Sequence, residues 1–296
     1  MDSQDGLASL RAIDGKTSVY GVIGYPVKHT LSPILHNAVF EHRKVNAVYL
    51  PFEVAPDNLY GAIEGFRSLG IKGLNVTIPH KEQVMHYLDT TPNLVDRAIG
   101  AVNTLVLTEG RALGFNSDGP GFLRDLKDQF AFEPEGRTAL LIGAGGSARA
   151  VAFSMLEANL QKLYIFNRTP DRARGLAEYA AQYFPDRDIE AVVSIDDIPT
   201  GVDLAVNCTS CGMNEQDPFP IDPDVLTKVA RVYDVIYVPE ETKLLAEARR
   251  RGLPVSNGIG MLIHQACVSH RLWFPDADRL ELYAVMRGAY EAWRKR

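Results

Sequence analysis

Short apolar runs and segments with helical spacing alternate along the chain. Up to residue 78 we expect, in order, a strand at 18–23, a helix at 33–43, a strand at 47–50, a helix at 58–69 and a strand at 73–78. Pro79 suits the first position of a third helix, with Val84, Met85 and Leu88 at helical spacing. This alternation predicts an α/β fold.

The pattern continues with one antiparallel interruption. Two short strands, 101–107 and 112–115, flank Glu109-Gly110, which is typical of a hairpin turn. A helix is expected at 121–130, and the loop that follows it at 133–136 marks a domain boundary. Beyond the loop, the pattern predicts a doubly wound sheet with strands at 138–142, 162–166, 189–193, 202–207 and 231–236.

Two charged residues stand where helix and turn formation do not require them. Lys81 ends Asn75-Val-Thr-Ile-Pro-His-Lys81 and falls in the first turn of the helix expected from Pro79. A cation there is disfavoured by about 0.3–1 kcal/mol, so the helix field favours the neutral amine that a general base needs. Asp118, in Asn116-Ser-Asp118-Gly, is the second residue, and the pair suggests proton transfer. The alternatives are a solvated surface lysine and a turn or N-cap carboxylate.

Length and charge restrict the classes of function. The 296 residues are 46% hydrophobic, which is enough for a large core and predicts two domains. The formal charge of −6 argues against a nucleic-acid or acidic-membrane partner, so we expect a small-molecule partner. The first residues, Met1-Asp-Ser-Gln-Asp-Gly, lack a signal core, and a cytoplasmic location is expected.

The three cysteines fit a reducing compartment. Cys208 and Cys211 form a Cys-x-x-Cys pair, but no second pair accompanies them, so buried, inert thiols are favoured over a metal or redox site. A last helical pattern at 260–273 carries His264 and His270, whose spacing of six is not that of metal ligands.

A glycine loop follows the strand expected at 138–142. Its pattern, Gly143-Ala-Gly-Gly-Ser-Ala-Arg-Ala150, is G-x-G-G-x-x-x-A rather than the full G-x-G-x-x-G. The strand before it and the helix after it are the context of a dinucleotide-binding unit, in which the loop and helix start receive a pyrophosphate. A tight turn without ligand is the alternative.

The next strand ends in Asn167-Arg168-Thr169, where an enzyme that uses NAD would present an acidic residue to the ribose. Arg168 and Arg172 can instead clamp a 2′-phosphate, which favours NADP. Asp171 competes with this interpretation, but behind Thr169 as N-cap it is explained as a helix-start acid.

Two hydroxyl groups surround the first expected helix start. Ser32 stands before Pro33 and is a natural N-cap, whereas capping does not require Thr30. Together they could present hydroxyls and helix-start amides to a ligand rich in oxygen.

With these motifs the chain resembles shikimate dehydrogenases, including the related quinate/shikimate enzymes, from about residue 18 to 293. The matching segments are the entry with Thr30 and Ser32, Asn75-Val-Thr-Ile-Pro-His-Lys81, Gly100-Ala-Val-Asn-Thr104, Gly114-Phe-Asn-Ser-Asp118, Gly143-Ala-Gly-Gly146, Asn167-Arg-Thr169, Asp234-Val-Ile-Tyr237 and Asn257-Gly-Ile-Gly-Met-Leu-Ile-His-Gln265. The resemblance implies NADP-dependent, reversible reduction of 3-dehydroshikimate to shikimate, without a metal. It implies an N-terminal α/β substrate domain (1–118 plus 260–296, with the C-terminal helices) and a Rossmann-type NADP domain (119–259).

The resemblance also assigns roles to residues. It makes Lys81 the acid–base and Asp118 the group that holds the lysine and the substrate hydroxyl in place. Its substrate contacts fall on Thr30, Ser32, Asn75, Thr77, Asn103, Tyr237 and Gln265. Its cofactor contacts fall on Gly143, Ala144, Gly145, Gly146, Ser147, Asn167, Arg168, Thr169, Arg172, Ile236 and Gly258.

Two departures from the family pattern concern specificity. Thr30 stands where most members have serine, and Ser117 where most have threonine. An added methyl group near the substrate carboxylate could shift the preference between shikimate and quinate by about 1–3 kcal/mol. A quinate/shikimate enzyme that uses NAD and a non-catalytic ligand sensor stay open as alternatives, as do a monomer and a homodimer.

Overall fold

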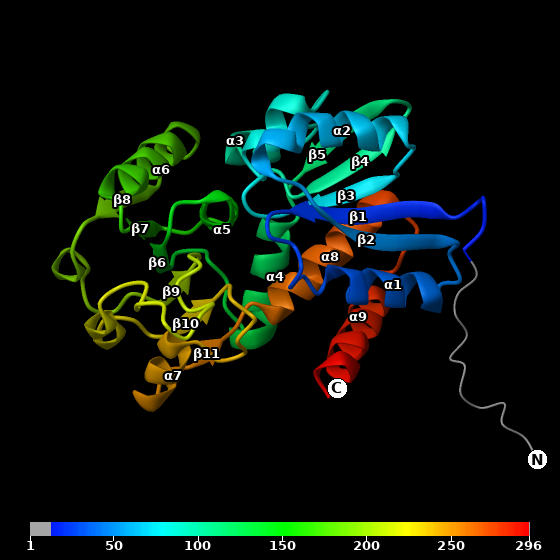
Figure 1. Ribbon diagram of the computed structural model, residues 1–296. Coiled ribbons are helices and arrows are strands. Elements are labelled where there is room, and N and C mark those ends of the chain that lie inside the picture. Colours follow the sequence, from blue (N-terminus) through cyan, green and yellow to red (C-terminus); the bar gives the residue numbers. More distant parts are fainter. Residues whose placement is uncertain (1–12, 296) are drawn as a thin grey trace, which may run out of the picture.

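The computed structural model describes residues 13–295, which form two sheets joined by helices (Figure 1). The first sheet has the order β2-β1-β3-β4-β5. Its strands are β1 (Ser18–Gly24), β2 (Ala47–Glu53), β3 (Gly73–Val76), β4 (Thr104–Thr108) and β5 (Arg111–Phe115). The first three strands are parallel, whereas β4 and β5 are antiparallel to their neighbours, as expected for a hairpin.

Helical segments accompany this sheet: α1 (Ser32–His42), η1 (Pro56–Asn58), α2 (Leu59–Ser68), η2 (Gln83–Tyr87) and α3 (Leu94–Ile99). The hairpin turn is confirmed, because Glu109 and Gly110 both have positive φ angles, 49° and 73°, as a type I′ turn requires. The sequence pattern missed α3, although Asn93 caps its start and Gly100, with φ 68°, ends it.

The second sheet is entirely parallel and has the order β11-β10-β9-β6-β7-β8. Its strands are β6 (Thr138–Ile142), β7 (Lys162–Phe166), β8 (Asp188–Val192), β9 (Leu204–Asn207), β10 (Val232–Asp234) and β11 (Val255–Ser256). Its helical segments are α5 (Gly146–Glu157), α6 (Pro170–Tyr183), η3 (Ile195–Asp197), η4 (Pro223–Thr227) and α7 (Lys243–Arg250). The predicted doubly wound sheet is therefore confirmed.

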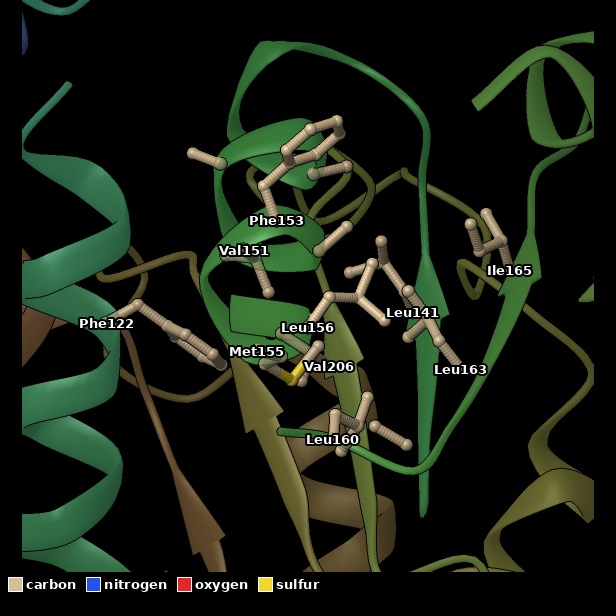
Figure 2. Close-up of a cluster of buried hydrophobic side chains, with 14 of the residues drawn as sticks. Phe122, Leu141, Val151, Phe153, Met155, Leu156, Leu160, Leu163, Ile165 and Val206 are labelled. Carbon is tan, nitrogen blue, oxygen red and sulfur yellow. The ribbon is translucent and has the colours of Figure 1, made fainter. Parts of the chain in front are cut away.

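The core of this second unit lies between the sheet and α5 (Figure 2). Leu141 and Val206 of the central strands pack with Val151 and Leu156 of α5, and all four are buried. The order of the strands reverses between β6 and β9, and the glycine loop after β6 lies at this switch point, where parallel α/β sheets bind ligands.

Two antiparallel helices, α4 (Asp118–Phe130) and α8 (Ile259–Trp273), pack between the sheets (Figure 1). The contact is close because glycine faces the partner on each helix. A Cβ on Gly121 would lie 2.7 Å from the backbone nitrogen of Gln265, and one on Gly260 would overlap the Asp125 carboxylate. The last helix, α9 (Arg279–Arg294), packs against α1.

The segment after β3 differs from the prediction. In place of an α-helix from Pro79, the chain makes a turn and then the short 3-10 helix η2. The Lys81 carbonyl accepts the backbone N–H of Val102 at 2.8 Å, and the N–H of Met85 bonds the Glu82 carbonyl at 3.3 Å in place of the Lys81 carbonyl that an α-helix would use. Lys81 therefore does not lie in the first turn of its own helix.

Between residues 13 and 295, no helix combines the length and the apolar character that a bilayer crossing demands.

Candidate active site

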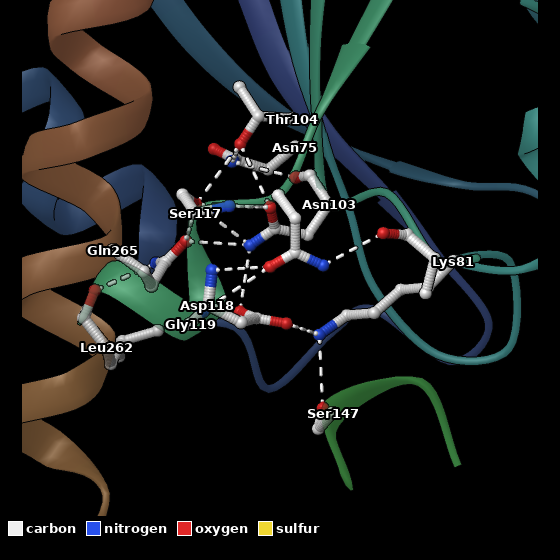
Figure 3. A network of polar contacts seen from close by, with 12 residues as sticks. Asn75, Lys81, Asn103, Thr104, Ser117, Asp118, Gly119, Ser147, Leu262 and Gln265 are labelled. Atoms are coloured by element: carbon white, nitrogen blue, oxygen red, sulfur yellow. Dashed lines mark hydrogen bonds and ion pairs between the residues drawn. The ribbon is translucent and has the colours of Figure 1, made fainter. Parts of the chain in front are cut away.

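Lys81 and Asp118 form a direct ion pair, with the lysine Nζ 2.5 Å from Asp118 Oδ2 (Figure 3). Both side chains are largely buried, with 13% of the lysine and 7% of the aspartate exposed. Low exposure excludes the solvated surface lysine as an interpretation. The two residues that the sequence singled out for proton transfer therefore meet in a protected site.

The residue at the positive end of a helix is Asp118, and not Lys81 as the sequence had suggested. Asp118 is the first residue of α4, and the positive end of a helix favours a carboxylate. The capping role belongs to another residue, because Asn116 Oδ1 accepts the backbone N–H of Asp118 at 3.0 Å. Both oxygens of Asp118 are thus free for Lys81 and for Asn103, whose Nδ2 donates to Oδ1 at 2.8 Å.

Besides Asn116, three buried amide side chains lie near this pair: Asn75, Asn103 and Gln265 (Figure 3). Asn103 also lies 3.4 Å from Gln265 Oε1, so α8 reaches the start of α4. Asn75 accepts a hydrogen bond from the Tyr49 hydroxyl at 2.8 Å and donates to the Asn103 carbonyl at 3.1 Å. Its polar atoms are therefore already paired within the protein.

The two hydroxyls before α1 also contact each other. Thr30 Oγ1 donates to Ser32 Oγ at 3.2 Å and accepts the backbone N–H of Ser32 at 3.3 Å. The N-cap of α1 is Leu31 rather than Ser32, so the N-cap interpretation was wrong. Because Ser32 already lies within the helix, its buried hydroxyl is not used for capping.

Thr77 lies at the carboxyl end of β3, where its backbone N–H bonds the carbonyl of Ile23 at the end of β1. The segment that carries Thr30 starts from this same edge of the sheet. Tyr237 follows β10 and packs, half-buried, against a cluster of α1, α8 and α9 residues. It lies beyond β10, which ends at Asp234.

The glycine loop approaches the ion pair directly. Gly143 has φ +116°, which favours glycine, and Gly145 has open space where a side chain would stand. A Cβ on Gly146 would lie 3.3 Å from the Lys81 Cβ, and Lys81 Nζ donates to Ser147 Oγ at 3.2 Å. The sequence had not indicated this contact between the loop and the lysine.

The residues expected at the adenine ribose fit a 2′-phosphate. Arg168 and Arg172 are exposed, and neither has an acidic partner within residues 13–295. Asp171, the competing feature, pairs with Arg174 instead. Thr169 is the N-cap of α6, as expected, although its side chain caps no backbone group, and the Asn167 amide donates to the Thr169 carbonyl at 2.9 Å.

The backbone of the segment after β10 lies in close contact with the backbone around Gly258. The backbone N–H of Gly258 bonds the carbonyl of buried Ile236 at 3.0 Å, and a side chain at Gly258 would overlap the Val235 carbonyl. Asp234 supports the segment by accepting the Thr242 hydroxyl and the Ile236 N–H. Burial raises the pKa of Asp234 to about 6.

The cysteines are free thiols in this structure, and burial raises the pKa of Cys208 and of Cys267, the latter to about 12. Throughout the described part of the chain, no group of three or more histidine, cysteine or acidic side chains could hold a metal ion. His264 is buried and stacks on Tyr283 at 4.4 Å, in agreement with a packing role.

Comparison with known proteins gives consistent matches. Residues 22–105 match the family model of the shikimate dehydrogenase substrate binding domain, and residues 126–210 match that of shikimate / quinate 5-dehydrogenase. The shikimate dehydrogenase (NADP(+)) of Caldanaerobacter subterraneus subsp. tengcongensis is 42% identical over 282 residues, which are 93% of this chain and 99% of that protein.

Solved structures agree over the same length. The shikimate dehydrogenase of Aquifex aeolicus has a TM-score of 0.84 and 37% identity, with 94% of this chain and 99% of the other covered. The Thermus thermophilus enzyme, in complex with NADP(H) and shikimate, has a TM-score of 0.81 and 34% identity, with 92% and 100% covered.

Proposed function

The chain belongs to the shikimate dehydrogenase family, and we propose that Lys81 and Asp118 are the catalytic pair of its reaction. The reaction is the NADP-dependent, reversible reduction of 3-dehydroshikimate to shikimate, a step of aromatic amino-acid biosynthesis. The observation that supports these roles is the buried contact of 2.5 Å between the lysine nitrogen and the aspartate carboxylate.

Lys81 moves the proton in this proposal. During reduction its ammonium donates a proton to the carbonyl oxygen of the substrate, and during oxidation the neutral amine takes the proton of the hydroxyl. The hydride would come from bound NADPH in reduction and would go to bound NADP+ in oxidation, at the same carbon atom. Asp118 holds the ammonium in line, and Asn103 in turn holds Asp118 through its 2.8 Å hydrogen bond.

Polar side chains from the first sheet and its loops, from the segment after β10 and from α8 are proposed to bind the substrate ring. Hydroxyl and amide groups suit a ligand that carries several hydroxyls and a carboxylate. The residues are Thr30, Ser32, Asn75, Thr77, Asn103, Tyr237 and Gln265. The Thr30–Ser32 pair beside the start of α1 is the proposed carboxylate site.

The second sheet is proposed to bind NADP. The loop from Gly143 to Ser147 would hold the pyrophosphate at the start of α5, and Arg168 and Arg172, with Asn167 and Thr169, would hold the 2′-phosphate. Ile236 and Gly258 are proposed to lie near the nicotinamide. We assign residues 1–118 plus 260–296 to the substrate domain and 119–259 to the NADP domain.

We further propose that the enzyme works in the cytoplasm on small molecules alone, as a monomer or a homodimer. Sedimentation velocity distinguishes these two states.

Initial rates of shikimate and quinate oxidation, each with NADP and with NAD, test the proposal. We expect a strong preference for shikimate with NADP. Comparable quinate turnover or a preference for NAD would contradict the specificity, while leaving the catalytic pair in place. No turnover with any pairing would favour the non-catalytic sensor.

A further inference from the structure

A closed ring of three hydroxyl groups lies behind the ion pair. Thr104 Oγ1 is 2.7 Å from Ser269 Oγ and 3.2 Å from Ser117 Oγ, and the two serine oxygens are 3.0 Å apart. The three residues belong to β4, to the position before α4 and to α8, and none has any exposed surface. The ring can therefore act only through the side chains that it touches.

Each of the three amides near the ion pair is bonded to this ring. Asn75 Nδ2 donates to Ser269 Oγ at 2.9 Å, and Asn103 Nδ2 donates to Ser117 Oγ at 2.9 Å. Ser117 Oγ lies 3.2 Å from Gln265 Oε1. The hydroxyl ring thus links the three amides that are proposed to bind the substrate.

Partners at both ends fix the direction of these amides. The oxygen and nitrogen of an amide have nearly the same size, so hydrogen bonds decide which way the group faces. The backbone carbonyl of Asn103 can only accept, so the Asn75 atom that it binds at 3.1 Å is Nδ2, which therefore also faces the ring. The Ser117 N–H bonds Asn103 Oδ1 at 2.7 Å, so Asn103 Nδ2 faces the ring and Asp118.

We propose that Ser269 is a positioning residue for the reaction, a role that rests on the proposed function. Its hydroxyl accepts the Asn75 amide, closes the ring with Thr104 and Ser117, and lies 3.1 Å from the backbone carbonyl of Gln265, one turn earlier on α8. Besides the 3.4 Å contact of Gln265 with Asn103, the ring is a second connection by which α8 orients Asn103 and, through it, Asp118.

Loss of this hydroxyl has a defined consequence. Without Ser269 Oγ, Asn75 Nδ2 loses its 2.9 Å acceptor and keeps only the longer contacts to the Asn103 carbonyl and Thr104 Oγ1, and Thr104 and Ser117 keep only each other in the ring. Buried groups that lose a partner rearrange to find another, and small misplacements in an active site are costly. Asn103 and Gln265 would then present their amides to the substrate less accurately.

Ser269→Ala in the full-length enzyme tests the proposal. We expect kcat/KM for shikimate to fall on the order of tenfold, with a higher KM for shikimate and an unchanged KM for NADP. Cys267→Ala is the matched control, because it removes one buried atom from the same helix at a thiol that faces Met286 instead of the ring. A substitution that only reduced the fraction of folded enzyme would lower kcat and leave the KM values for shikimate and NADP unchanged.

A second pair of variants covers the case in which Ser269→Ala does not fold. Thr104→Val replaces the ring hydroxyl by a methyl group of similar size, whereas Thr104→Ser keeps the hydroxyl. Only the valine variant should therefore have a lower kcat/KM for shikimate. Equal kinetics for Ser269→Ala and Cys267→Ala, or for the two Thr104 variants, would overturn the proposal. Calorimetric titration measures the dissociation constant of shikimate for each variant and its control. This binding comparison tests the ring even if the wild type shows no turnover.

Discussion

Lys81 Nζ lies 3.2 Å from the Ser147 hydroxyl, although Lys81 follows β3 of the first sheet and Ser147 lies in α5 of the second unit. The lysine that is proposed to move the proton thus touches the loop that is proposed to hold the cofactor phosphates. The orientation of the lysine therefore depends on how closely the two units approach.

The first prediction concerns this contact. Ser147→Ala should lower kcat by roughly three- to tenfold, because Lys81 keeps Asp118 but loses its second partner. Kinetics at saturating NADP, together with the dissociation constant for NADP, check this result. A loss confined to NADP affinity would assign Ser147 to the cofactor alone.

Lys81→Met should lower kcat by about 10²–10⁴-fold, because a positioned acid–base group contributes that much to a proton transfer. NADP affinity should change little, which fluorescence titration measures. Lys72→Met, at an exposed lysine on the preceding segment, is the control and should keep full activity. Wild-type rates in the Lys81 variant would refute the assigned role.

Cofactor choice should depend on Arg168. Arg168→Gln is expected to reduce kcat/KM for NADP by on the order of 10- to 100-fold, since a hydrogen bond to a charged group is worth about 1.5–3 kcal/mol. The value for NAD should stay unchanged, because NAD lacks the 2′-phosphate. Arg174→Gln is the matched control, since Arg174 is already paired with Asp171. Parallel losses with both cofactors would contradict the phosphate assignment.

Acid stability should depend on His270. The imidazole is buried and neither ring nitrogen has a hydrogen-bond partner within the described residues; burial lowers its pKa from 6.5 to about 4. The unfolded chain therefore binds more protons between these values, so the folded state loses stability as the pH falls from 6.5 towards 4.

His270→Phe should remove this loss and raise the free energy of unfolding near pH 4 by about 1–3 kcal/mol relative to the wild type. Urea unfolding at pH 7.5 and pH 4.5 measures the difference. The carboxyl pKa of Asp96, like that of Asp234, is raised to about 6 by burial, and both groups titrate in the opposite sense in the same window. Asp96 and Asp234 are present in the wild type and in the His270→Phe variant, so their contributions cancel in the difference between the two. His86→Phe, at an exposed site, should leave the pH dependence unchanged.

Substrate preference should respond to Thr30. Thr30→Ser keeps the hydroxyl that bonds Ser32 and removes one methyl group, so a bulkier ring substituent gains space. We expect the ratio of quinate to shikimate efficiency to rise by up to about tenfold, within the range that one methylene commands. Competition between the two substrates at fixed NADP measures the ratio, and Thr90→Ser is a distant exposed control. An unchanged ratio would remove Thr30 from the determinants of specificity.

The overall architecture could be predicted from the sequence because its signals are local. Apolar runs mark the strands, and the Glu109-Gly110 turn marks the hairpin within a few residues of chain. The prediction of a helix at Lys81 was wrong: the Lys81 carbonyl bonds the N–H of Val102, twenty-one positions away, and Met85 bonds Glu82 instead. Local periodicity contains no information about such a competitor.

The candidate site shows the same limit. Lys81 and Asp118 could be named from the sequence, but the helix position that singled out Lys81 does not exist, and their 2.5 Å contact required the fold. Ser269 carried no signal at all, because its partners Thr104 and Ser117 lie more than 150 positions earlier in the chain. Hydrogen-bond networks between distant segments are a property of tertiary packing.

The antiparallel packing of α4 against α8 has a consequence for the modular design of the protein. The chain leaves α4 at Phe130 and returns to α8 at Ile259, so the whole unit of the second sheet is inserted between two neighbouring helix ends. Insertions at adjacent ends disturb the host little. Exchange of this unit for another dinucleotide-binding unit would need two adjacent junctions and a new core that accepts Phe122 and Leu126 of α4, which pack with the second sheet. Asp118 and the hydroxyl ring would stay with the substrate half.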